Sequence, residues 1–104
     1  MFIAELSTRA RLNLPVKVMI LKNNSLAEVR FEQTELGYAP FGIELGPIDF
    51  VAFAKACGAA GFHADKPTDL RLAMDAALRS PGPALLEVLV DPEELPAVPD
   101  KFRA

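Results

Sequence analysis

The sequence predicts an α/β fold, organised as a partial three-layer domain in which helices flank a small parallel sheet. Two runs, Val16–Leu21 and Ala84–Val90, are almost continuously apolar. This pattern is typical of strands buried on both faces of a parallel sheet. Segments with helical spacing of apolar residues lie between the candidate strands. Strands that alternate with helices form parallel sheets with right-handed crossovers, so the order along the chain predicts the fold class.

Composition sets the first limits on function. The chain has 104 residues, which is enough for one domain, and 51% of them are hydrophobic, which favours a packed core. Eleven basic and fourteen acidic residues give a net charge of −3. This balance argues against binding to nucleic acid or to anionic membranes, because both need a basic face. One cysteine and one histidine are too few for a disulfide framework or a Cys/His zinc cluster.

The sequence also bears on location. Its apolar runs are far shorter than the roughly 20 residues of a membrane-spanning helix, so no membrane span is expected. Residues 1–16 lack a basic segment ahead of a continuous apolar stretch, so no signal peptide is predicted. We therefore expect a soluble cytoplasmic protein, and a free thiol fits that compartment.

In the first half of the chain, apolar residues at helical spacing predict a helix over residues 1–13, which Pro15 ends. After the first strand, Asn-Asn-Ser interrupts the pattern, and Leu26–Glu35 is expected to be helical. Residues 36–47 contain three glycines and two prolines and predict a long loop. Long loops in compact domains are often functional or mobile.

In the second half, Pro47 is expected in the first turn of a helix that Gly58 ends. A weaker strand is predicted over residues 60–64, and Thr68 is expected to cap the next helix. Each helix carries an apolar stripe that should face the core: Phe50, Val51, Phe53, Ala54 and Cys57 in the first, and Leu70, Ala73, Met74, Ala77 and Leu78 in the second.

The predicted sheet is unusually small. It has about three strands, where most sheets have about four to six. Such a sheet leaves one edge poorly covered. The sequence therefore predicts an incomplete domain over residues 1–94, followed by a proline-containing tail over residues 95–104.

The residues best placed for chemistry are Asn23, Asn24 and Ser25, which directly follow the first buried strand. Ligands of open α/β sheets bind at the carboxyl ends of the strands. A side-chain amide oxygen and a nearby main-chain carbonyl are suitable ligands for Mg²⁺. The same residues also favour a simple turn or a helix cap, and their types alone leave both interpretations open.

Other candidates are expected to be structural. His63 has no partner that the sequence reveals, and a lone histidine is more often structural than catalytic. Cys57 lies on an apolar helix face, which suits a buried, unreactive thiol. Four charged residues are expected to form a solvated helix face with contacts between residues four apart: Glu28, Arg30, Glu32 and Glu35.

A family resemblance rests on these segments. Leu14–Ser25 resembles the second half of the thiamine-diphosphate motif, in which Gly-Asp-Gly is followed further along the chain by Asn-Asn at the end of a strand. From the first helix to Glu94, the chain resembles the C-terminal domain of the pyruvate oxidase, quinone-dependent pyruvate dehydrogenase and acetolactate synthase group. The further segments that carry this resemblance are Gly37-Tyr38, Gly42–Leu45, Ile48–Phe50, Ala54–Gly58 and Gly82–Val88.

The resemblance implies a thiamine-diphosphate-binding fold and a parent enzyme, an oxidoreductase or a lyase of pyruvate metabolism, that decarboxylates a 2-oxo acid such as pyruvate. It implies thiamine diphosphate and Mg²⁺ as cofactors, and places any flavin in a domain outside this sequence. The cofactor-binding residues would be Asn23, Asn24, Ser25 and Leu26. The metal ligands among them would be the side chain of Asn24 and the main-chain oxygen of Leu26.

The chain also departs from the family pattern. It contains no Gly-Asp-Gly, and Ala27-Glu28 stand where the family has a small glycine after Asn-Asn. We therefore expect a fragment or remnant that holds no catalytic residue and is not active alone. Its expected partner is a second copy or the pyrimidine-binding domain of a related chain. The alternatives are a non-enzymatic interaction or dimerisation module, which would use the sheet edge and residues 36–47, and one chain of a split enzyme.

Overall fold

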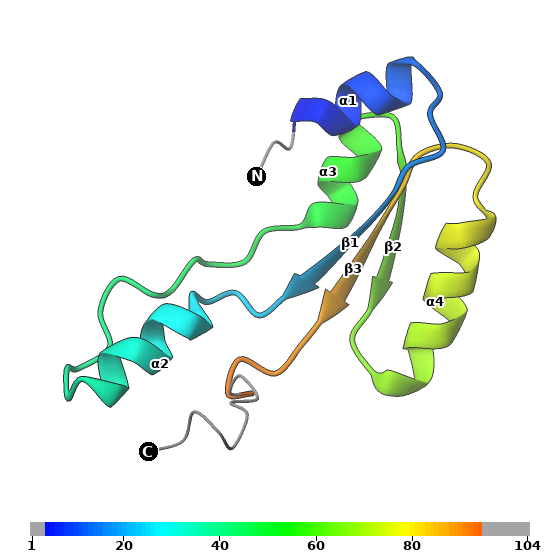
Figure 1. Ribbon diagram of the computed structural model, residues 1–104. Coiled ribbons are helices and arrows are strands. Elements are labelled where there is room, and N and C mark those ends of the chain that lie inside the picture. The colour runs from blue at the N-terminus through cyan, green and yellow to red at the C-terminus, as the bar shows by residue number, and fades with distance from the viewer. Residues whose placement is uncertain (1–3, 95–104) are drawn as a thin grey trace, which may run out of the picture. The chain divides into compact units, whose positions relative to one another are not determined.

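The computed structural model describes residues 4–94. The elements follow in the order α1 (Ala4–Arg11), β1 (Lys17–Lys22), α2 (Ala27–Glu35), α3 (Phe50–Ala56), β2 (Ala60–Ala64), α4 (Pro67–Arg79) and β3 (Ala84–Leu89) (Figure 1). This is the predicted order. The chain divides into two compact units, which we call the sheet unit (described residues 4–22 and 48–90) and the turn unit (described residues 23–47 and 91–94). The predicted tail, residues 95–104, lies outside the described residues, and the predicted domain over residues 1–94 stays a prediction.

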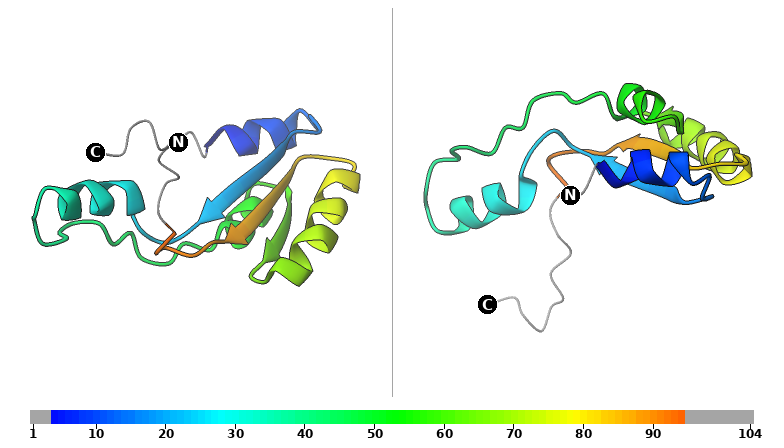
Figure 2. Two further views of the ribbon diagram at one scale, coloured as in Figure 1. Left: turned by 60° about the horizontal axis from the view of Figure 1, so that its bottom comes forward. Right: turned by 90° about the horizontal axis from the view of Figure 1, so that it is seen from above.

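The sheet unit contains three parallel strands in the order β1-β3-β2 (Figure 2). β3 is central, and Leu85 pairs in register with Val18 on one side and with Gly61 on the other. The connections between these parallel strands include α3 and α4, which both pack against the sheet. The α/β fold class is thus confirmed.

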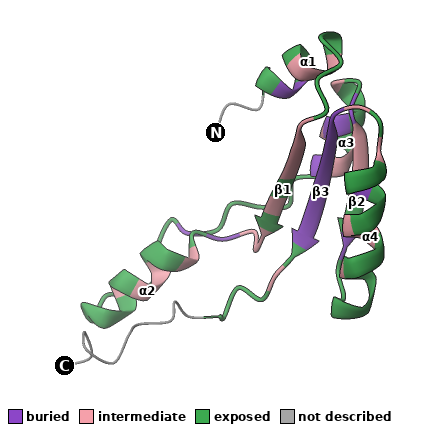
Figure 3. Cartoon of the chain, turned by 45° about the vertical axis from the view of Figure 1, so that its right-hand side comes forward, coloured by how far each residue is buried: buried purple, intermediate pink, exposed green. Residues whose placement is uncertain are grey.

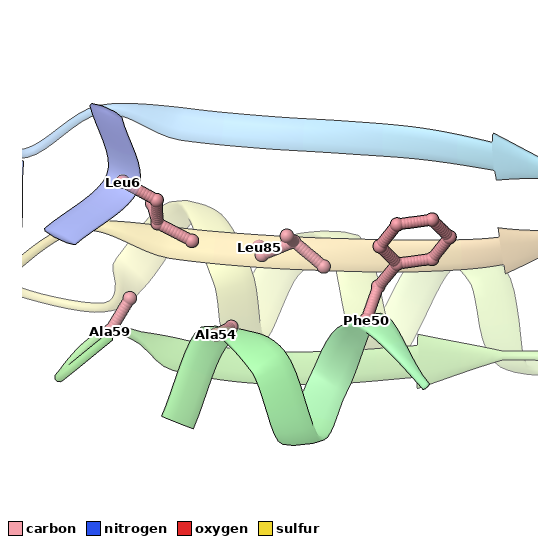
Figure 4. Packing of buried hydrophobic residues seen from close by; sticks show 5 residues of the cluster. All are labelled: Leu6, Phe50, Ala54, Ala59 and Leu85. Atoms are coloured by element: carbon pink, nitrogen blue, oxygen red, sulfur yellow. The ribbon is translucent and has the colours of Figure 1, made fainter. Parts of the chain in front are cut away.

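One face of the sheet packs against α1 and α3. Its core is a cluster of five buried residues, shown in Figure 4: Leu6, Phe50, Ala54, Ala59 and Leu85. The approach of α3 to β2 requires a glycine at position 61, because a Cβ there would lie 2.8 Å from Cγ1 of Val51 and 2.9 Å from its carbonyl oxygen. The predicted apolar stripe of α3 therefore faces the core, with Phe53 and Cys57 half-buried beside it.

The opposite face packs against α4, which lies behind the strands in Figure 4. Ala77 of α4 and three residues of β3 (Ala84, Leu86 and Val88) are buried there, and Leu70, Ala73 and Met74 are partly buried against them. Leu78 was predicted to belong to this stripe, and that prediction is wrong. It is 60% exposed, because the face of α4 that packs on the sheet carries Leu70, Ala73, Met74 and Ala77.

Two predicted helix starts are also wrong. α3 begins at Phe50 and not near Pro47, because the side chain of Asp49 accepts a hydrogen bond from the amide of Ala52 at 2.9 Å and caps the helix. α4 begins at Pro67, which needs no amide partner in a first turn. Thr68, predicted as the cap, lies inside that helix.

The turn unit contains α2 and the loop that follows it. No residue of α2 is buried (Figure 3). The loop is held to the helix by Gln33, whose side-chain amide donates to the carbonyl of Phe41 and accepts from the amide of Phe41, both at 3.0 Å. Residues 36–47 thus form a loop, as predicted, and one side chain fixes its middle.

Candidate functional site

The Asn-Asn-Ser segment forms a tight turn directly after β1. Asn24 has a φ of +56°, in the left-handed region that asparagine tolerates better than most residues. The side-chain oxygen of Asn23 accepts a hydrogen bond from the amide of Ser25 at 3.1 Å. The segment is therefore a turn stabilised by its own side chain, which is the structural interpretation that the sequence left open.

The turn is also tied to the end of the loop in the turn unit. Ser25 and Glu44 form an isolated antiparallel bridge. The amide of Leu26 donates to the carbonyl of Ile43 at 2.8 Å, and the amide of Leu45 donates to the carbonyl of Asn24 at 3.0 Å. These main-chain bonds hold the backbone of the turn in one conformation, so its remaining polar groups have fixed positions.

One of those groups is unsatisfied. The hydroxyl of Ser25 is buried, and it has no hydrogen-bond partner within the part of the chain that the structure describes. A buried hydroxyl without a partner costs roughly 1–3 kcal/mol. Native proteins seldom keep such a group unless a water, an ion or a ligand satisfies it. The turn therefore contains a polar group suited to a bound molecule.

The carbonyl of Leu26 has capacity for a ligand as well. It accepts the first hydrogen bond of α2, from the amide of Arg30 at 3.0 Å. A carbonyl oxygen has two lone pairs, so a second interaction remains open. Together, Asn24 and Leu26 offer hard, neutral oxygens of the kind that Mg²⁺ accepts.

The turn supplies no cluster of charged ligands. Among residues 4–94, no group of three or more His, Cys, Asp or Glu side chains is placed to hold a metal ion. The residues therefore fit Mg²⁺ only as part of a ligand set. The negative charge of that set has to come from a diphosphate and from an acidic ligand outside the turn.

Arg30 of α2 contacts the segment that follows β3. It forms an ion pair with Glu93 and donates to the carbonyl of Pro92. The hydrogen bond to Glu93 raises the pKa of Arg30. The sequence predicted contacts between α2 charges four residues apart, but Arg30 instead contacts the segment that follows β3.

A second polar cluster lies in the sheet unit, and sequence reasoning missed it. Glu87 belongs to the central strand β3 and is only 4% exposed. Its Oε1 accepts from Nζ of Lys22 at 3.0 Å and from the amide of Phe50 at 3.3 Å. Its Oε2 lies 2.8 Å from Nδ1 of His63. One carboxylate thus links both neighbouring strands and the first residue of α3.

The charge of Glu87 is well stabilised. Burial by itself would raise the pKa of this carboxyl group, but hydrogen bonds from Lys22, His63 and the amide of Phe50 outweigh burial and lower it. The only sequence signal for the cluster was an acidic residue inside an otherwise apolar strand. His63 therefore has a partner, Glu87, that the sequence did not reveal.

The comparisons with known proteins bear on the turn. Residues 1–88 match the family described as thiamine pyrophosphate enzyme, C-terminal TPP binding domain. The chain belongs to this family. Its fold agrees, since it superimposes with a TM-score of 0.79 on the thiamine diphosphate-dependent 4-hydroxybenzoylformate decarboxylase of Rhodococcus jostii RHA1, at 29% identity, over 86% of this chain and 17% of that one.

Two sequence relatives extend this result. The Bacillus subtilis (strain 168) protein YdaP, named as thiamine pyrophosphate-containing, is 34% identical over 98% of this chain. The chloroplastic acetolactate synthase 2 of Nicotiana tabacum is 38% identical over 95% of it. The chain spans only 17% of the length of each relative. Within residues 4–94, no helix has the length and apolar character needed to cross a membrane.

Proposed function

We propose that the chain supplies the Asn-Asn part of a thiamine diphosphate–Mg²⁺ site in an enzyme that decarboxylates a 2-oxo acid of the pyruvate type. The observation that carries this proposal is the turn over residues 23–26, whose buried Ser25 hydroxyl has no partner among residues 4–94, in a chain of the thiamine-pyrophosphate-binding family. A cytoplasmic location belongs to the proposal, and the free thiol of Cys57 is consistent with it.

Each residue of the turn has a distinct role in the proposed site. Asn24 contributes its side-chain oxygen to Mg²⁺, and Leu26 contributes the second lone pair of its carbonyl. Asn23 fixes the turn through its bond to the amide of Ser25. The Ser25 hydroxyl would help to hold the diphosphate as a hydrogen-bond donor. The bound cofactor supplies the electron sink for decarboxylation, while this chain binds and orients it.

The proposed site is completed by groups outside this sequence. Two neutral oxygens hold a hard dication weakly, so an acidic ligand is needed beside them. We assign that ligand, and the groups that activate the cofactor, to another segment or chain, such as a pyrimidine-binding domain. The described chain is therefore not catalytic by itself, and the parent enzyme works as an oligomer or as a split enzyme.

Calorimetric titration with thiamine diphosphate and Mg²⁺ tests the proposal. The test variant is Asn24→Gly, which removes the amide while keeping the left-handed backbone favourable. Asn13→Gly is the matched control, because Asn13 also has a positive φ, of +50°, but lies in the sheet unit. We expect weak Mg²⁺-dependent binding that Asn24→Gly abolishes and Asn13→Gly leaves unchanged. Equal binding by both variants would contradict the assignment of Asn24.

A gain-of-function variant sharpens this test. Asn24→Asp places a carboxylate where the ligand set lacks charge. We expect it to tighten Mg²⁺ binding by roughly tenfold or more, since charged oxygens are the stronger ligands of hard cations. Unchanged Mg²⁺ affinity would show that position 24 does not touch the metal.

An interaction module remains the second candidate function. The observation that favours it is the exposure of Met19 and Leu21 on β1, which pairs only with β3 within the described residues.

A further inference from the structure

The turn unit keeps its conformation with very little buried apolar surface. Among its described residues, 23–47 and 91–94, only Ser25 and Ile43 are buried. α2 contributes no buried residue (Figure 3). Burial of apolar surface is the dominant stabilising term in most folded segments. Because that term is small here, the conformation of the loop over residues 36–47 depends largely on hydrogen bonds.

Gln33 of α2 makes two of these hydrogen bonds with one residue of the loop. Its Nε2 donates to the carbonyl of Phe41, and its Oε1 accepts from the amide of Phe41, both at 3.0 Å. A side-chain amide is suited to this, since it carries a donor and an acceptor on one planar group. We call the pair of bonds the Gln33 clamp. It satisfies both main-chain groups of Phe41 and so fixes the orientation of the loop at this residue.

The clamp lies close in the chain to the Asn-Asn-Ser turn's own bonds. Only Gly42 separates Phe41 from Ile43, whose carbonyl accepts from the amide of Leu26 at 2.8 Å. Gly42 has a φ of +69°, and glycine has many other conformations open to it. The backbone at this position is therefore free to move unless its neighbours are held. The Gln33 clamp holds the residue on one side of it.

The bonds between the loop and the turn fall on the residues proposed to bind Mg²⁺. The amide of Leu26 donates to Ile43, and the carbonyl of Asn24 accepts from the amide of Leu45 at 3.0 Å. Asn24 and Leu26 contribute a side-chain oxygen and a main-chain oxygen to the proposed site. Ligands that are already held in place bind more tightly, because less conformational freedom is lost on binding. Release of the loop should therefore weaken the site.

We propose that Gln33 is a positioning residue of the thiamine diphosphate–Mg²⁺ site. It acts through the loop: the clamp fixes Phe41, the loop then holds the amide of Leu26 and the carbonyl of Asn24, and these residues present their oxygens to the metal. This inference rests on the proposed function, because it assigns to Gln33 the orientation of the ligands named there.

Hydrogen exchange of the ligand-free chain tests the clamp without any cofactor. Gln33→Met removes both bonds and keeps a side chain of similar length and helix propensity. Thr34→Val is the matched control, because it removes a bond of 2.9 Å to the carbonyl of Arg30 that stays within α2. We expect Gln33→Met to speed exchange at the amides of Leu26 and Leu45 at least ~3-fold, and the control to leave both unchanged. Unchanged exchange in Gln33→Met overturns the proposal.

A third variant separates the clamp from a general loss of structure. At neutral pH, the carboxylate of Gln33→Glu accepts from the amide of Phe41 but cannot donate to its carbonyl. We expect the amide of Phe41 to stay protected from exchange in Gln33→Glu and to lose protection in Gln33→Met. Equal protection in the two variants would show that the side chain does not hold Phe41, and would overturn the proposal.

Calorimetric titration with thiamine diphosphate and Mg²⁺ measures the consequence for the site. We expect Gln33→Met to weaken binding at least ~3-fold and Thr34→Val to leave it unchanged. Faster exchange at Leu26 and Leu45 with unchanged affinity overturns the positioning role. A failure of the proposed function is distinguishable, because the unmodified chain then binds no cofactor. Gln33 would in that case have no site to position, although exchange would still measure the clamp.

Discussion

Two buried polar groups of this protein have opposite surroundings. In the sheet unit, the carboxylate of Glu87 has hydrogen-bond partners from Lys22, His63 and the amide of Phe50. In the turn unit, the hydroxyl of Ser25 is buried with no partner among residues 4–94. The comparison teaches that burial alone does not identify a binding site. A polar group with all its partners inside the chain stabilises the fold, whereas the Ser25 hydroxyl has hydrogen-bonding capacity that no group of residues 4–94 uses.

The largest effect on the free energy of unfolding is expected from substitution of Glu87. Glu87→Ala leaves the half-buried Lys22 without its carboxylate and removes the link between the three strands. We expect the free energy of unfolding to fall by about 3 kcal/mol, as when one partner of a buried ion pair is removed. Urea denaturation followed by circular dichroism measures it. A loss below ~1 kcal/mol would mean that the cluster adds little to the sheet, and the comparison would then fail.

The same carboxylate predicts an acid dependence. Its pKa in the folded chain lies below its ordinary value of 4.5. The ionised form is therefore favoured by folding, and its contribution is complete above about pH 4.5 and is lost as the pH falls through the folded-state pKa. We expect Glu87→Gln to flatten this part of the stability profile, measured by urea midpoints from about pH 6 to about pH 3. If the stability profile of Glu87→Gln is as steep as that of the unchanged chain, other groups cause the loss of stability in acid.

A smaller loss of stability is expected from substitutions of Asn13 and Asn24, which both have a positive φ. Alanine at a positive φ costs roughly 1 kcal/mol. Asn13→Ala and Asn24→Ala should therefore destabilise their own units by similar amounts, while only Asn24→Ala weakens cofactor binding. Hydrogen exchange measures the local opening, and calorimetry measures the binding. Loss of binding in both variants would show that strain, and not the amide of Asn24, controls it.

Much of the sheet unit was predictable because its strands are encoded locally. The apolar runs that became β1 and β3 are typical of parallel strands. β3 is buried except at Leu89, but no residue of β1 is buried, so the predicted burial of the first strand on both faces is wrong. The start of α3 was missed because it depends on one hydrogen bond, which the amide of Ala52 donates to the side chain of Asp49, and this cap competes with the preference of Pro47 for a first turn.

The polar clusters were less predictable, for a physical reason. Glu87 acquires its role from Lys22 and His63, which are distant in sequence and meet only when β1 and β2 flank β3. The Asn-Asn-Ser turn was recognisable from its residues and their place after a strand. Its unsatisfied hydroxyl was not, since burial of Ser25 depends on the packing of the folded chain.

Ser25→Ala tests the central claim most directly. Removing an unsatisfied buried hydroxyl should leave the free energy of unfolding unchanged or raise it by up to ~1 kcal/mol. The same change should weaken Mg²⁺-dependent binding of thiamine diphosphate at least ~5-fold, because the ligand loses a donor. Both quantities are measured on one preparation, by urea denaturation and by calorimetric titration. A clear loss of stability with unchanged binding would show that the hydroxyl is structural and would contradict the account.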